Sequence, residues 1–142
     1  MTPVETLAEG CKILDSILVP SGFRFISGQA GKSSGGHFAS GAYVRNERRL
    51  ELHYRYSLGL VSYHFRELTA SHESVIRALG VYGNHQYPGF SDAPLDAFVH
   101  LRNDLETFFQ IFIAGSDEAL SSLLALAQHK EATRPKGIKG LP

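Results

Sequence analysis

The order of the hydrophobic patterns along the chain predicts an α+β domain. Apolar residues recur at helical spacing near the N-terminus, alternate with polar residues through the middle, and return to helical spacing in the C-terminal half. We therefore expect an N-terminal helix, an antiparallel meander of about four strands, and three helices packed on one sheet face. The 142 residues suit one domain, placed at residues 1–131 and followed by a basic flexible tail at 132–142.

The first helix is predicted by a start signal followed by an apolar stripe. Thr2 can cap the helix, a proline fits its first turn, and Glu5 can complete a capping box with Thr2. The segment 20–22, Pro-Ser-Gly, then ends the helix. The stripe consists of Val4, Leu7, Cys11, Leu14 and Leu18, and its single cysteine is expected to be an inert core residue.

The middle of the chain favours strands joined by short turns. Residues 27–36 are rich in Gly and Ser and are expected to form a loop, and residues 46–48 a turn. The expected strands are 23–26, 38–45, 49–56 and 60–66.

Alternation in the last two strands suggests a pairing register with Leu58-Gly59 at the hairpin tip. A slip of one residue would turn every side chain to the wrong face. This register pairs Tyr56 with Val61, Tyr54 with Tyr63 and Leu52 with Phe65 on one face, and Arg55 with Ser62, His53 with His64 and Glu51 with Arg66 on the other.

Three helices are expected to follow the strands. Ser71 can cap a short helix that stops at Gly80, and Ser91 or Asp92 can cap a long helix that reaches Gly115. Ser116 can cap the last helix. The apolar residues of the two longer helices are Phe98, Leu101, Leu105, Phe108, Phe112, Leu120, Leu123, Leu124 and Ala127.

Two surfaces are candidates for binding a partner protein. The polar hairpin face can steer an encounter while aromatic neighbours supply contact area, although a solvated sheet face is the alternative. The loop 82–90 combines exposed aromatic residues with nearby acids, although its aromatics could instead fold back onto the core. The partner-binding candidates are Glu51, His53, Arg55, His64, Arg66, Tyr82, Tyr87, Phe90, Asp92 and Asp96. The acids Asp92, Asp96, Asp104 and Glu106 either form an acidic patch or are ordinary residues of a solvated helix face.

A Gly-rich segment is the candidate for binding an anion. Gly31-Lys32-Ser33 matches the end of a phosphate-binding loop, but Ile26 stands where that motif needs its first glycine, and no helix follows directly. A looser backbone nest formed by Gly31, Lys32, Ser33 and His37 remains the alternative.

The seven histidines invite a metal hypothesis. His53 and His64 could meet across the hairpin and His37 could approach them, but the pattern places no carboxylate or fourth ligand. No nucleophile elbow or recognisable acid pair is present either. We predict no catalytic residue, no metal and no cofactor.

Charge and hydropathy limit the compartment and the partner. Fourteen basic and fourteen acidic residues cancel, which argues against coating nucleic acid or an anionic membrane. Residues 36–70 nevertheless carry five basic and three acidic groups, and residues 71–131 carry three basic and eight acidic groups. No leader and no membrane span are expected, so we predict a cytoplasmic protein.

Three segments carry a resemblance to a wider group of proteins. They are Gly-His-Phe-Ala-Ser-Gly at 36–41, Arg-Leu-Glu-Leu-His-Tyr-Arg-Tyr at 49–56, and Tyr-Pro-Gly-Phe-Ser-Asp at 87–92. The chain resembles small single-domain bacterial proteins, some of which are immunity proteins that neutralise toxins of contact-dependent or related polymorphic systems. The resemblance implies a protein-binding function and assigns no functional residue.

The sequence therefore favours a protein-binding module, with immunity to a toxin as its specific form. The first alternative is a small-molecule or anion binder, or a minor enzyme, that uses the segment 27–36 with nearby histidines. A second alternative is a structural subunit that pairs through an exposed strand edge.

Overall fold

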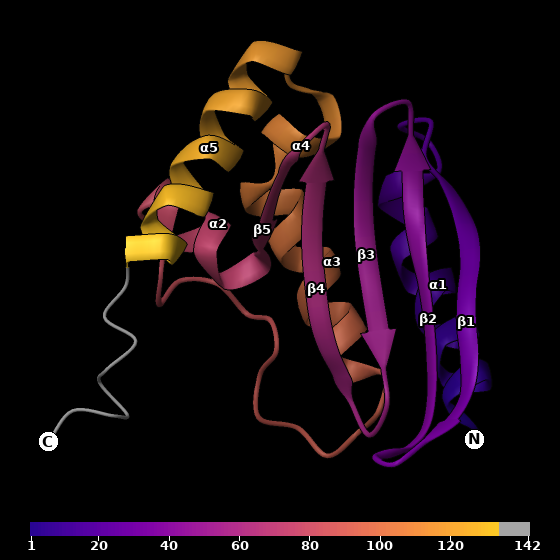
Figure 1. Cartoon of the computed structure of the whole chain (residues 1–142). Helices are drawn as coiled ribbons and strands as arrows, with labels where there is room; N and C mark the ends of the chain where they lie inside the picture. The colour runs from indigo at the N-terminus through magenta and orange to yellow at the C-terminus, as the bar shows by residue number, and fades with distance from the viewer. Residues whose placement is uncertain (134–142) are drawn as a thin grey trace, which may run out of the picture.

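The structure is a computed structural model that describes residues 1–133. It has the predicted α+β fold class, in which an N-terminal helix precedes a five-stranded antiparallel sheet and further helices follow (Figure 1). Residues 134–142, which make up most of the predicted tail, lie outside the described residues.

Helix α1 (Pro3–Leu18) begins at the predicted capping box. The Thr2 hydroxyl accepts a hydrogen bond from the Glu5 amide at 3.1 Å, and the Glu5 carboxylate accepts one from the Thr2 amide at 2.8 Å. Gly22 has a φ of 94° where the chain turns after the helix. Leu7, Cys11, Leu14 and Leu18 are buried, so the apolar stripe is largely confirmed, but Val4 is exposed.

The sheet contains five strands, and their order across the sheet is the same as their order in the sequence. Each neighbouring pair is antiparallel. The last strand was not predicted, because it is only four residues long and lies directly before a helix. The strands are β1 (Arg24–Ser33), β2 (Gly36–Arg45), β3 (Arg48–Tyr54), β4 (Leu58–Phe65) and β5 (Leu68–Ser71).

The prediction of a loop at 27–36 was wrong. Strand β1 continues through Ser33 and pairs with β2 down to Ser33 opposite Gly36, with an irregularity between Ser27 and Ala30. The small residues that suggested a loop are tolerated because backbone bonds to β2, rather than side-chain burial, hold this strand.

The predicted register of the β3–β4 hairpin was also wrong. Leu52 lies opposite Val61 rather than Phe65, a shift of four residues, and the turn lies at residues 55–57. The shift is even, so Leu50, Leu52 and Tyr63 still face the core as expected. Tyr56, which was expected to face the core, is 80% exposed.

Four helices, rather than three, follow the sheet. The predicted long helix is broken at Phe109, whose backbone (φ −110°, ψ 27°) is not helical. Ser71 caps the first of the four helices and Ser116 caps the last, as expected. The helices are α2 (His72–Leu79), α3 (Asp96–Phe108), α4 (Gln110–Ala114) and α5 (Asp117–Thr133).

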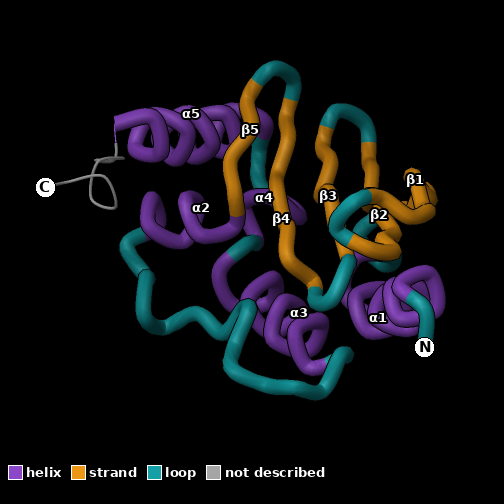
Figure 2. The backbone as a smooth tube through the Cα atoms, turned by 60° about the horizontal axis from the view of Figure 1, so that its bottom comes forward, coloured by secondary structure: helices purple, strands orange, loops and turns teal. Residues whose placement is uncertain are grey.

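The helices and the sheet form two layers, and no helix within residues 1–133 lies over the other sheet face. Helices α1 and α3 lie behind the sheet, and α5 runs beside β5 (Figure 1). Viewed from below, α1 and α3 again lie on one side of the strands (Figure 2). The core between the layers includes Leu14, Tyr43, Leu50, Leu52, Tyr63, Phe98, Leu101, Phe109, Phe112 and Leu120.

Candidate functional site

The open sheet face carries the side chains that alternate with the core residues. Arg49, Glu51 and His53 project from β3, and Leu60, Ser62 and His64 project from β4. All six are intermediate or exposed, whereas Leu50 and Leu52 between them are fully buried. Of the predicted hairpin surface, Glu51, His53 and His64 therefore share one face.

Glu51 is at the centre of a small ion-pair network on this face. Its carboxylate lies 3.0 Å from Nε2 of His64 and 3.9 Å from Nη2 of Arg49. The expected meeting of His53 with His64 does not occur, because His53 lies opposite Leu60 and His64 opposite Arg49. Exposed pairs of this kind contribute little stability, so they leave the face free to exchange partners.

An aromatic stack lies beside the ion pairs. The rings of His53 and Phe38 stack with centroids 5.4 Å apart and planes at 15°. The Arg55 guanidinium lies 5.5 Å from the Phe38 ring and donates hydrogen bonds to the Ser33 hydroxyl and the Gly36 carbonyl. Arg55 is thus in the β3–β4 turn rather than in a strand, but it contacts the same Phe38 ring as His53.

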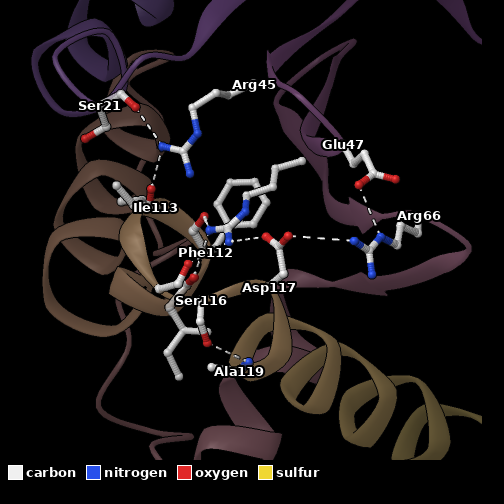
Figure 3. Close-up of polar contacts among 12 residues, drawn as sticks. Ser21, Arg45, Glu47, Arg66, Phe112, Ile113, Ser116, Asp117 and Ala119 are labelled. Atoms are coloured by element: carbon white, nitrogen blue, oxygen red, sulfur yellow. Dashed lines mark hydrogen bonds and ion pairs between the residues drawn. The ribbon is translucent and has the colours of Figure 1, made fainter.

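Arg66 does not belong to this face, and its predicted pairing with Glu51 was wrong. It lies in the β4–β5 turn with a φ of 55°. Its Nε donates to Glu47 at 3.2 Å, and its Nη2 lies 3.7 Å from Asp117 (Figure 3). The register shift accounts for the difference, because Ser62 occupies the position opposite Glu51.

Two arginines beside Arg66 hold the connection between α4 and α5. Arg48 is buried and donates to the carbonyls of Phe112 and Gly115 and to Asp117. Arg45 donates to the carbonyls of Ser21 and Ile113 (Figure 3). Burial, together with the charge of Arg48, lowers the pKa of Arg45. These bonds satisfy carbonyls at a helix end that would otherwise lack partners, so the cluster is structural.

The loop 82–90 is divided between core and surface. Tyr87 is buried and its hydroxyl donates to the Leu58 carbonyl, as expected if the loop's aromatics fold back onto the core, whereas Phe90 is fully exposed. Tyr82 is 53% exposed, and the Cζ atom of the Arg77 guanidinium lies 3.7 Å from the centroid of the Tyr82 ring. The loop passes below the sheet towards α3, away from the open face (Figure 1).

The expected acidic residues after this loop do not form one patch. Asp92 is exposed, and Asp96 accepts a hydrogen bond from the Ser91 hydroxyl at 2.6 Å. Asp104 is only 1% exposed, so its assignment to a solvated helix face was wrong.

Asp104 is part of a buried polar cluster that sequence reasoning missed. Its carboxylate accepts hydrogen bonds from the amides of Gln86 and Tyr87 and lies 2.9 Å from Nε2 of His72. The other ring nitrogen of His72 lies 2.7 Å from the Tyr63 hydroxyl. An ionised carboxylate only accepts, so His72 carries its hydrogen on Nε2 and, when neutral, accepts from Tyr63 on Nδ1.

Burial and hydrogen bonding act in opposite directions on the pKa values of this cluster. Burial lowers the pKa of His72, against the opposing effect of Asp104. Burial alone would raise the pKa of Asp104, but the hydrogen bonds from His72, Tyr87 and Gln86 outweigh it and hold that pKa below its usual value. The arrangement is similar to a catalytic acid–base relay, but His72 is 2% exposed and no substrate can reach it. We therefore assign it a structural role, joining α2, α3 and the loop 82–90.

The predicted anion-binding residues lie at the far end of the β1–β2 hairpin. Gly31, Lys32 and Ser33 are within β1, and His37 lies opposite Lys32. No helix begins there, and the Ser33 hydroxyl is engaged by Arg55. Anion binding by these residues stays a prediction.

Other chemically capable groups do not form a second site. Within residues 1–133, no group of three or more His, Cys, Asp or Glu side chains is arranged to hold a metal ion. Burial raises the pKa of Cys11 to about 11, so its thiol is unreactive at neutral pH. A hollow of about 510 Å³ between α2 and α5 is bordered by Arg77, Tyr82 and Thr133, the last described residue.

None of the helices in residues 1–133 has the length and apolar character needed to cross a membrane.

Comparison of the chain with protein-family models, with curated proteins and with solved structures finds no match. Any functional assignment therefore depends on the geometry described above.

Proposed function

We propose that the chain is a protein-binding module and that the open sheet face is its binding surface. The supporting observation is that no described helix covers this face, while it presents stacked aromatic rings beside an ion-pair network. Protein interfaces combine aromatic area with polar groups in this way, and arginine and aromatic residues supply much of their binding energy. Toxin neutralisation, implied by the sequence resemblance, is the specific form that we propose.

A site-specific photo-crosslinker tests where the partner binds. Leu60 on the open face and Leu126 on α5 are 42% and 44% exposed, so they form a matched pair. We expect p-benzoylphenylalanine at position 60, but not at position 126, to yield one discrete crosslinked protein in the native cell. Equal crosslinking at both positions, or crosslinking only at position 126, would rule out the sheet face.

Affinity for the captured protein tests which side chains matter. Phe38→Ala removes the ring on which His53 and Arg55 pack, and a central aromatic truncation of this kind costs about 2 kcal/mol or more of binding free energy. Leu126→Ala is the control and should leave affinity unchanged. Reversal of Arg66 is a poor test because it would break the internal ion pairs with Glu47 and Asp117.

Growth of bacteria tests the toxin-neutralising form of the proposal. Co-expression with the captured protein should rescue growth if that protein is a toxin, and the Phe38→Ala chain should rescue it less well. A captured protein that does not inhibit growth on its own would leave the binding function standing and reject immunity.

A further inference from the structure

The free edge of β1 differs from the other edge of the sheet. At the β5 edge, the amide of Thr69 donates to the Gln128 side chain at 3.0 Å and the amide of Ser71 donates to Glu131 at 3.5 Å. Side chains of α5 thus satisfy the outward amides of β5. Among the described residues, β1 pairs with β2 alone, and no helix lies along its outer edge (Figure 1).

Strand β1 is also held in place without burying its own side chains. Nine of its ten residues are exposed, and only Phe25 is partly buried. Its far end is braced from the β3–β4 turn, because Arg55 donates to Ser33 and the Tyr56 hydroxyl donates to the Gly35 carbonyl at 2.7 Å. In an antiparallel strand, alternate backbone groups point away from the neighbour, so β1 presents a preformed row of unpaired donors and acceptors.

The side chains of β1 determine what can approach that row. Half of its ten residues are small, namely Ser27, Gly28, Ala30, Gly31 and Ser33, so another backbone can come close. Both charged residues, Arg24 and Lys32, are basic. Basic residues and an irregularity such as that between Ser27 and Ala30 discourage two identical edges from pairing, while the charges favour an acidic strand.

We propose that the β1 edge binds an extended acidic segment of the partner protein as a sixth strand. This inference rests on the proposed protein-binding function and specifies how the partner is held: main-chain hydrogen bonds supply affinity and the basic side chains select an acidic sequence. Because the strand is already ordered, little conformational entropy is lost from this chain on binding.

Amide hydrogen exchange of the full chain with a defined peptide tests the proposal. The probe is a short capped peptide of alternating Val and Glu, and its control has Lys in place of each Glu. At about ten times its Kd, the acidic peptide should slow exchange of alternate β1 amides about tenfold. Unchanged exchange, or equal protection by the Lys peptide, would overturn the proposal.

Charge-reversal variants separate a specific edge from general attraction. Arg24→Glu/Lys32→Glu should abolish protection by the acidic peptide, whereas Lys12→Glu/Arg102→Glu makes the same change in net charge on the helices and should retain it. Equal loss in both variants would show non-specific attraction. Protection that appears without peptide and grows with protein concentration, together with a dimer in sedimentation, would make a second copy the occupant and overturn the acidic partner.

The two proposals can fail separately. Crosslinking from Leu60 without peptide protection of β1 would reject strand addition and keep the sheet-face function. Protection of β1 without crosslinking from Leu60 would reject the sheet-face function and keep strand addition.

Discussion

At one end of the sheet, β5 is enclosed by α2 and α5, and at the other end no described element lies along the outer edge of β1. The β5 end contains the buried His72–Asp104 cluster, and its edge amides are bonded by side chains of α5. The β1 end buries almost none of its own side chains and depends on backbone bonds to β2. The same sheet therefore combines a region with many buried contacts and a region with few, and the second is the one that we propose binds a partner. Four measurements can sharpen or break this contrast.

The largest effect is expected for Asp104→Asn. The new amide keeps one acceptor oxygen, but its NH2 group replaces the other oxygen and faces either the Gln86 amide or the Tyr87 amide and His72. Leaving a buried donor without its acceptor costs about 1–3 kcal/mol of unfolding free energy for each donor. Chemical denaturation measures the loss. Asp96→Asn, also on α3, is the control and should cost less than about 1 kcal/mol. Similar losses in the two variants would break the contrast.

Acidification should weaken the β5 end before the β1 end. The pKa of His72 is lowered in the folded state, so its contribution is complete above the unfolded value of 6.5 and is lost as pH falls below it. Asp104, whose pKa is also lowered in the folded state, adds a further loss below its ordinary value of 3.8. Each group contributes a slope of at most about 1.4 kcal/mol per pH unit. A free energy of unfolding that stays constant from pH 7 to about pH 4 would contradict a lowered pKa for His72.

A smaller effect is expected for Gln128→Ala at the β5 edge. The Thr69 amide would lose the acceptor that it contacts at 3.0 Å, at a cost of about 0.5–1.5 kcal/mol. Hydrogen exchange should speed up at Thr69 and remain unchanged at β1. If Thr69 already exchanges as fast as the outward amides of β1 in the parent chain, α5 does not cap this edge.

The smallest effect is expected for Gln29→Ala in β1. Its side chain is exposed, and the Ser40 hydroxyl bonds to its backbone rather than to its amide group. The free energy of unfolding, measured by thermal denaturation, should therefore change by no more than about 0.5 kcal/mol. A loss comparable with that of Asp104→Asn would show that β1 carries stability after all.

The sequence allowed elements and faces to be predicted better than pairings. Alternation placed Leu50, Leu52 and Tyr63 in the core correctly, because the period of two defines the face of each residue. It could not distinguish registers that differ by an even number of residues, since each keeps every side chain on its face. The predicted contacts of His53 with His64 and of Glu51 with Arg66 failed for this reason.

The candidate site was predicted only in part for similar reasons. Glu51, His53 and His64 share the open face because they alternate with apolar residues. The burial of Asp104 was missed because a charged residue on a helix is usually solvated. One signal was present: Asp104 comes three residues after Leu101 and directly before Leu105, so it lies beside the buried stripe of α3.

The buried guanidinium of Arg48 has a consequence for how the chain acquires its structure during synthesis. Its acceptors, including Phe112, Gly115 and Asp117, lie 64 to 69 residues further along the chain. At about 5–20 residues per second, a ribosome needs roughly 3–14 s to add that length. Of the helices that lie behind the sheet, only α1 precedes the meander in the chain, so for much of this interval the nascent sheet lacks α3, α5 and the acceptors for Arg48. The nascent sheet is thus exposed to chaperones and proteases until α5 emerges.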